Sequence, residues 1–291
     1  HFSSARSQTG SIRAERPSDE VKMAGALARL TEEDPSITAA HNAETGEMVL
    51  AGQGETQLQI ALARLKSESG LAILRDRPAV PYRETISKGA TIHARHKKQS
   101  GGHGEFADVH LEVRPQPRGA GFAFDDRITG GVVPKQYIPA VQKGVEGFMA
   151  KGPLGHPVVD VAVTLTDGSY HTVDSSDMAF QKAAQKAMSD AMASCGPVLL
   201  EPVLKVRVAV PSEFTPRVQR IVTGRRGQLL GFDARPGWPG WDEVEALMPQ
   251  AETQDLIVEL RSASLGVGSY ATEFGHLQEC TGREAEKAAR G

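Results

Sequence analysis

The chain has 291 residues, a length that predicts two or three compact domains, each able to bury its own apolar core. Hydrophobic residues make up 40% of the chain and charged residues 24%, values typical of a globular protein. No apolar run approaches the roughly 18 residues that span a bilayer. The net charge of -3 excludes a polycation that coats nucleic acid indiscriminately, so any such contact must be local.

Cysteine usage and the first residue give further expectations. Two cysteines, Cys195 and Cys280, cannot build a disulfide framework and fit a reducing, cytoplasmic location. The chain begins at His1 without a signal sequence, and we interpret it as a fragment. It has no G-x-x-x-x-G-K-[ST] loop, because residues 224–227 lack the lysine and hydroxyl that hold phosphate and magnesium. We therefore expect neither enzymatic activity nor a cofactor in this chain.

The two ends of the chain share one order of predicted elements. In the first 82 residues, apolar periodicity predicts helices over 17–30 and 54–69, and short apolar runs predict strands at 11–14, 37–40, 48–51 and 71–74. From residue 203, helices are predicted over 213–223 and 251–260, and strands at 203–210, 228–232, 243–248 and 270–276. Both segments are βαββαβ, which is the ferredoxin-like order.

The middle of the chain has a different pattern. Strands are predicted at 91–96, 107–113, 121–127 and 158–166, and helices over 135–150 and 176–193, the second capped by Ser176. The fold class is therefore α+β with three domains, at residues 1–85, 86–202 and 203–291. The Ala- and Glu-rich segment 283–290 is compatible with a short helix or a frayed tail.

Four histidines, His93, His96, His103 and His110, raise the question of a zinc site. Structural zinc sites usually pair thiolates closely, and no cysteine is near these histidines. On one extended strand, His93 and His96 also point to opposite faces. We therefore expect no metal, and interpret the histidines as solvated or as facing RNA.

Two other patterns suggest chemistry only superficially. His171 and Asp174 lie close to Ser175 and Ser176, but no nucleophile-elbow glycines surround either serine, and Ser176 is better explained as a helix cap. Residues 266–271 (GVGSYA) resemble a dinucleotide fingerprint, yet lead into a strand and not into a helix. We expect no catalytic residue.

Two basic stretches contain no carboxylate. Residues 88–104 carry Lys88, Arg95, Lys97 and Lys98, and residues 217–226 carry Arg217, Arg220, Arg225 and Arg226. Such stretches are candidate phosphate contacts, and the alternative is an ordinary solvated face.

Several motifs together resemble one family, elongation factor G, in the order in which the family has them. Residues 51–58 (AGQGETQL) resemble the A-G-M-G-E-L-H-L signature of its third domain. The others are 81–85 (PYRET), 98–102 (KQSGG), 130–134 (GGVVP), 137–141 (YIPAV), 167–171 (DGSYH), 173–176 (VDSS), and 225–227 (RRG) with Gly231.

The resemblance implies domains III, IV and V of a translational GTPase, with the nucleotide domain and domain II absent. Domains III and V of that family are ferredoxin-like, and domain IV is similar to a ribosomal protein domain. GTP and magnesium are then expected in the missing amino-terminal domains. The family also has a helix at the place of residues 283–290, which favours the helical alternative.

The resemblance also implies partners and contact residues. In the family, domain IV enters the ribosomal A site during translocation and touches tRNA and mRNA; the matching tip residues here are Gln99, Ser100, Gly101, Gly102 and His171. Ribosomal RNA is expected to contact Arg225 and Arg226 in domain V. We expect a monomer that binds the ribosome and no membrane.

Three departures from the family pattern keep alternatives open. His103 stands where the family usually has arginine, Gln57 where the signature has histidine, and Ala107-Asp108 where Gly-His is usual. A diverged paralogue acting in ribosome recycling or protection is the first alternative. A stand-alone RNA-binding adaptor is the second, from a different functional class.

Overall fold

The computed structural model describes residues 3–5 and 8–290, and the chain divides into two compact units. The first unit contains the chain up to Pro81 together with Pro202–His276. The second contains Tyr82–Glu201 together with the chain from Leu277. In the described part of the chain, no helix is long and apolar enough to cross a membrane.

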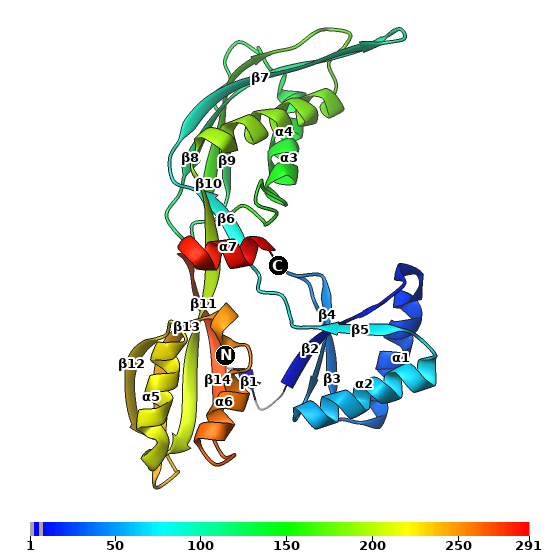
Figure 1. Ribbon diagram of the computed structural model, residues 1–291. Helices are drawn as coiled ribbons and strands as arrows, with labels where there is room; N and C mark the ends of the chain where they lie inside the picture. The colour runs from blue at the N-terminus through cyan, green and yellow to red at the C-terminus, as the bar shows by residue number, and fades with distance from the viewer. Residues whose placement is uncertain (1–2, 6–7, 291) are drawn as a thin grey trace. The chain divides into compact units, whose positions relative to one another are not determined.

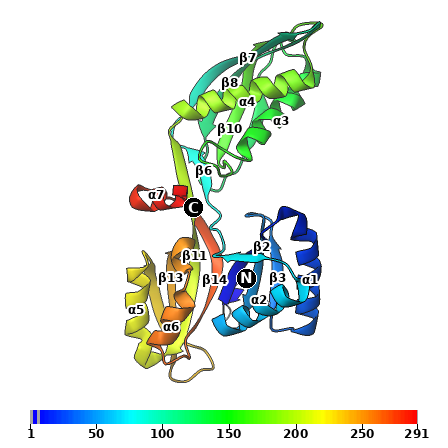
Figure 2. The same cartoon turned by 45° about the vertical axis from the view of Figure 1, so that its right-hand side comes forward.

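The amino-terminal module of the first unit has the predicted βαββαβ order. Its sheet is antiparallel with strand order β3-β4-β2-β5, and α1 and α2 pack on it (Figure 2). The elements are β2 (Gln8–Ala14), η1 (Pro17–Asp19), α1 (Glu20–Glu33), β3 (Thr38–Asn42), β4 (Glu47–Gly52), α2 (Glu55–Ser69) and β5 (Ile73–Asp76). The core contains the predicted apolar stripes of both helices, Met23, Leu27 and Leu30 on α1 and Leu58, Leu62 and Leu65 on α2.

The carboxyl-terminal module repeats that topology with different residues. Its strand order is β14-β11-β13-β12, and β1 (Ser3–Ala5) pairs with β14 at one edge. The elements are β11 (Pro197–Pro211), η3 (Ser212–Phe214), α5 (Thr215–Gly224), β12 (Gln228–Ala234), β13 (Trp241–Pro249), η4 (Gln250–Thr253), α6 (Leu256–Ala263) and β14 (Ser269–Glu279). Residues 266–271 run into β14, as predicted, and open no helix.

The second unit is built on a sheet of strand order β7-β8-β10-β9, and α3 and α4 pack side by side on it (Figures 1 and 2). That sheet consists of β7 (Ala90–Ser100), β8 (His103–Pro115), β9 (Ala123–Asp126) and β10 (Val161–Ser169). The strand β6 (Arg83–Ile86) of this unit pairs instead with residues 197–200 of β11. The helices of the unit are η2 (Lys135–Tyr137), α3 (Ile138–Met149), α4 (Asp177–Ser194) and α7 (Gly282–Arg290). The helical alternative for the end of the chain is therefore confirmed.

Side chains alternate along β8 between the two faces of the sheet. Ala107, Val109, Leu111 and Val113 are fully buried in the core that α3 and α4 cover. Asp108 and His110 consequently lie on the opposite, open face, because successive residues of a strand point to opposite sides.

The two helices of this unit approach closely at Gly144 of α3. A Cβ built there would lie 2.5 Å from the carbonyl oxygen of Gln181 and 2.9 Å from Cβ of Ala184, both on α4. Such distances leave no room for a methyl group, so this glycine sets the spacing between the helices.

We predict that substitution by alanine has opposite effects on stability at two glycines of α3. Gly144→Ala should destabilise the second unit by about 1–3 kcal/mol, because the helices must move apart. Gly147→Ala is the matched control: its Cβ would meet only Gln185 Nε2, at 3.5 Å, so better helix propensity should stabilise by about 0.5–1 kcal/mol. Hydrogen exchange of the α3 and α4 amides measures both effects, and equal protection in the two variants would contradict the close approach.

Candidate nucleic-acid interface

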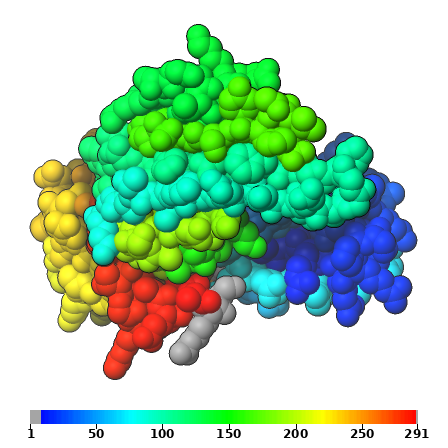
Figure 3. All heavy atoms as spheres, turned by 90° about the horizontal axis from the view of Figure 1, so that it is seen from above, coloured from blue at the N-terminus to red at the C-terminus, as the bar shows by residue number. Residues whose placement is uncertain are grey.

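The β7–β8 hairpin ends in a two-residue glycine turn. Gly101 and Gly102 have φ of 58° and 101°, and Ser100 pairs with His103 across the turn. Glycine adopts consecutive positive φ values at the least cost, which explains this dipeptide at the tip. Gln99, Ser100 and both glycines are exposed. The hairpin end projects beyond α3 and α4 in Figure 1, and its teal atoms project in the view from above in Figure 3.

A second loop, residues 170–176 between β10 and α4, lies against the base of this turn. The Phe106 amide donates to the Asp174 carbonyl oxygen at 2.9 Å, and the Ser175 hydroxyl donates to the Phe106 carbonyl oxygen at 2.7 Å. A Cβ on Gly104 would lie 2.6 Å from the Asp174 carboxylate, so the absence of a side chain at Gly104 permits this approach. The structure therefore brings the two predicted tip loops together.

His171 belongs to the second loop and is held by backbone groups. Its Nδ1 accepts hydrogen bonds from the amides of Val173 at 3.2 Å and Asp174 at 3.1 Å, while the Asp174 carboxylate is too far for a hydrogen bond, at 3.6 Å. An accepting nitrogen carries no hydrogen, so this geometry fits a neutral ring with its N–H at Nε2. The side chain is 53% exposed, so Nε2–H can donate to an outside acceptor.

The neighbouring serines have structural roles. Ser176 Oγ accepts from the Ala179 amide at 3.1 Å, which confirms the predicted helix cap. Ser175 Oγ bonds to the Phe106 carbonyl and accepts from the His171 amide. With Nδ1 of His171 also engaged by amides, these residues do not form a nucleophile–base pair.

Three family models together match nearly the whole chain. "Elongation Factor G, domain III" matches residues 7–74, "Elongation factor G, domain IV" matches 78–196 and "Elongation factor G C-terminus" matches 198–288. The chain belongs to the elongation factor G family. A curated relative from Synechocystis sp., "Elongation factor G-like protein", is 56% identical over 92% of this chain. This chain spans 40% of that relative's length.

A solved structure has a similar fold over nearly the whole chain. A crystal structure of a Thermus thermophilus protein matches with a TM-score of 0.85 and 38% identity, covering 97% of this chain and 42% of that one. In the nomenclature of elongation factor G, the amino-terminal module is domain III, the second unit contains domain IV, and the carboxyl-terminal module is domain V.

The basic stretch of domain IV is partly neutralised by the strand beside it. Asp108, with 4% of its side chain exposed, accepts from Arg95 Nε at 2.9 Å and contacts His93 Nε2 at 2.7 Å. Glu105 contacts His96 and Lys182, and the hydrogen bond from His96 is the main cause that lowers the pKa of Glu105. Asp108 therefore lies paired within the sheet and adds no free carboxylate to the tip.

Arg225 and Arg226 of domain V lie in an internal network. Arg225 Nε lies 2.8 Å from Glu259 Oε2, and its Nη1 donates to the carbonyls of Glu252 at 2.7 Å and Gln254 at 2.8 Å. Arg226, at φ 55°, donates from Nε to the Glu252 carboxylate at 3.0 Å. These bonds tie the residues that follow α5 to η4 and α6. The role of both arginines toward ribosomal RNA stays a prediction.

Gln57 of domain III, another departure from the signature, is also structural. Its Oε1 accepts from the Gln53 amide at 2.6 Å, and its Nε2 donates to Ser36 Oγ. The side chain thus joins the start of α2 to the loop before β3.

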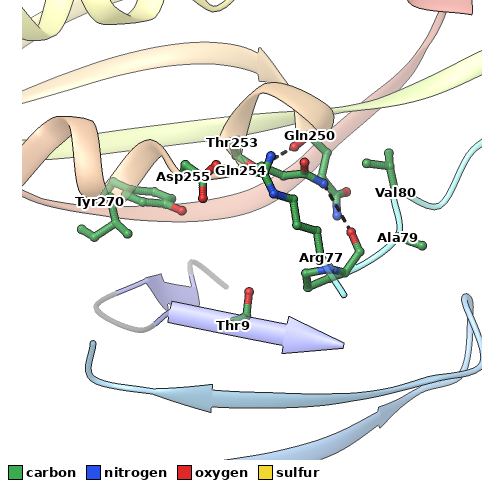
Figure 4. Close-up of a pocket in the computed structure, with 11 residues that line it drawn as sticks. Thr9, Arg77, Ala79, Val80, Gln250, Thr253, Gln254, Asp255 and Tyr270 are labelled. Carbon is green, nitrogen blue, oxygen red and sulfur yellow. Dashed lines mark hydrogen bonds and ion pairs between the residues drawn. The ribbon is translucent and has the colours of Figure 1, made fainter. Parts of the chain in front are cut away.

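A small cavity of about 170 Å³ lies in the first unit (Figure 4). Arg77 and Asp255, which both line it, form an ion pair at 2.7 Å, and Gln254 Nε2 donates to the Pro78 carbonyl at 3.3 Å. Burial raises the pKa of the lining Tyr270. The cavity lies in the first unit and does not contain any of the residues predicted to contact RNA, so it is not the candidate site.

Sequence reasoning missed the backbone contacts that join the two tip loops. The sequence signal was Ser175 beside Ser176: only one serine was needed as the cap of α4, and the other was left without an explanation.

We predict that Ser175→Ala loosens the loop at residues 170–176. The substitution removes a donor to Phe106 and an acceptor for the His171 amide, which should reduce local stability by about 1–3 kcal/mol. Hydrogen exchange of the His171 and Phe106 amides measures the effect. Val173→Ala is the control in the same loop, because Val173 is 81% exposed. Unchanged exchange in Ser175→Ala would show that the hydroxyl does not hold the loop.

Proposed function

We propose that the chain is the ribosome-binding part of an elongation factor G type translational GTPase, and that the domain IV tip contacts tRNA and mRNA in the A site during translocation. The observation that carries the proposal is the docking of the His171 loop on the glycine hairpin. It gathers the five proposed contact residues, Gln99, Ser100, Gly101, Gly102 and His171, at one end of the domain.

The chemistry of the tip suits RNA recognised by shape. Two glycines allow close approach of the backbone, and a neutral imidazole can stack or donate a hydrogen bond without the cost of burying a fixed charge. Lys97 and Lys98 are exposed on β7 beside the turn and can approach phosphates. The nearby carboxylate of Glu105 is already engaged by His96 and Lys182.

Further parts of the proposal concern the full-length protein. We expect amino-terminal domains to supply GTP hydrolysis with magnesium, a cytoplasmic location and a monomeric state. The partners are then the ribosome, with its RNA and proteins, and the tRNA and mRNA at the decoding site.

A diverged paralogue acting in ribosome recycling or protection is the second candidate. The name of the Synechocystis relative, an elongation factor G-like protein, and His103 in place of the usual arginine favour it. Translocation and subunit splitting, assayed side by side on a full-length protein, separate the two candidates. The genomic reading frame upstream of His1 tests the stand-alone adaptor, since a continuous frame that encodes a P-loop removes it.

We predict that His171→Ala slows tRNA movement in a full-length protein that contains this chain. Loss of one hydrogen bond predicts a rate about threefold to tenfold lower, with ribosome-stimulated GTP hydrolysis intact. His171→Asn is the sharper variant, because its amide oxygen can replace Nδ1 as the acceptor for the loop amides but offers nothing at Nε2. It should therefore be as slow as His171→Ala.

Two results would speak against this role of His171. Normal translocation by both variants would remove its contact with RNA. Recovery of the rate by His171→Asn alone would show that only the shape of the loop matters. Val173→Ala serves as the control that should translocate normally.

For domain V, we predict that ribosome binding weakens as salt rises and that Arg226→Gln lowers the salt slope by about one. Arg225 is a poor probe of RNA contact, because its guanidinium binds backbone carbonyls of the module and its substitution would also disturb the fold. Arg220→Gln on the exposed face of α5 is the comparison for a general loss of charge. An unchanged slope in Arg226→Gln would assign Arg226 to the internal network alone.

A further inference from the structure

Two histidines face each other across the β7–β8 hairpin. His93 and His110 are direct cross-strand partners, and their rings stack with centroids 4.0 Å apart and planes 4° from parallel. Both lie on the open face of the sheet, opposite α3 and α4, since their neighbours Ala94, Val109 and Leu111 are in the core.

A carboxylate lies beside the pair. Asp108 precedes His110 by two residues on β8 and thus shares its face. Its Oδ2 lies 2.7 Å from His93 Nε2, and its Oδ1 lies 3.8 Å from His110 Nε2. One ligand atom from each of the three residues lies within 4.8 Å of the others. Asp108 is nearly inaccessible, whereas 48% of the His93 side chain is exposed, so an ion from solvent can reach the group.

We propose that His93, Asp108 and His110 bind a divalent transition-metal ion of the zinc class on the open face of domain IV. Two imidazoles and one carboxylate are a ligand set that zinc accepts, with the fourth position left to water. Imidazole selects zinc, copper and nickel over magnesium and calcium. The rings stand parallel, so each must rotate about its side-chain torsions to direct Nε2 at a shared ion.

Arg95 limits the strength of this site. Its Nε donates to Asp108 Oδ2 at 2.9 Å, and its guanidinium lies 5.4 Å from the centre of the Phe106 ring. The guanidinium thus occupies one carboxylate oxygen and opposes a second cation there. The other carboxylate oxygen of Asp108, Oδ1, lies 3.8 Å from His110 Nε2.

The prediction that the chain holds no metal rests in part on the faces to which His93 and His96, two histidines of one strand, point. Those two histidines do point to opposite faces: His96 contacts Glu105 and lies toward α4, whose Lys182 binds the same carboxylate. The proposed site instead uses His110 from the neighbouring strand, whose pairing with His93 depends on the register of the hairpin.

Calorimetric titration of the 291-residue chain with Zn²⁺ tests the proposal. We expect one site, and affinity about tenfold or more lower in His93→Ala and in His110→Ala. His96→Ala is the matched control, a histidine of the same strand on the other face, and should bind as the parent chain does. If His96→Ala loses as much affinity as the other two, or none of the three loses any, the proposal is wrong.

Two further measurements do not depend on the folding of those variants. In the parent chain, Zn²⁺ should shift the imidazole ¹⁵N resonances of His93 and His110 but not of His96; equal shifts at all three would contradict a specific site. Arg95→Gln should bind Zn²⁺ several times more tightly, because the competing cation at Asp108 is removed. Binding in Arg95→Gln that is no tighter than in the parent chain would contradict a metal ion that shares Asp108 with Arg95.

Discussion

The pairing of β7 with β8 is the constraint on which the features of domain IV depend. Eleven residue pairs in register, from Ala90 with Val113 to Ser100 with His103, determine which side chains meet the helices and which meet the solvent. A shift of one residue would move every side chain of β7 to the other face. The glycine turn holds this register at the tip, since the two central positions both need positive φ.

Hydrogen bonds from the backbone of β8 also position the loop before α4. The Phe106 amide and carbonyl, both on β8, bind Asp174 and Ser175, so the strand that forms one side of the hairpin also positions His171. The imidazole is then fixed through Nδ1 and presents Nε2 outward. Preorganisation of this kind lowers the entropic cost of binding, which suits a tip that we propose must fit a crowded RNA site.

Much of the fold could be predicted from the sequence, because apolar periodicity and turn residues are local signals. The βαββαβ order of domains III and V, the cap at Ser176 and the amphipathic helices are examples. Contacts between strands were harder to predict from the sequence. No local pattern states that His93 lies opposite His110, or that Asp108 and Glu105 neutralise the basic stretch 88–104. Likewise, Arg225 is a basic residue in the sequence, but the structure engages it with Glu259 and two carbonyls.

The central claim is that the glycine hairpin and the His171 loop form one RNA-facing tip. Directed hydroxyl-radical probing from single cysteines, placed at Ser100 and at Val173 in a ribosome-bound full-length protein, tests it most directly. Cys195 and Cys280 are buried and should react little with the tether. The account predicts that both positions cleave overlapping RNA at the decoding site. Cleavage from only one position, or cleavage at unrelated sites, would contradict it.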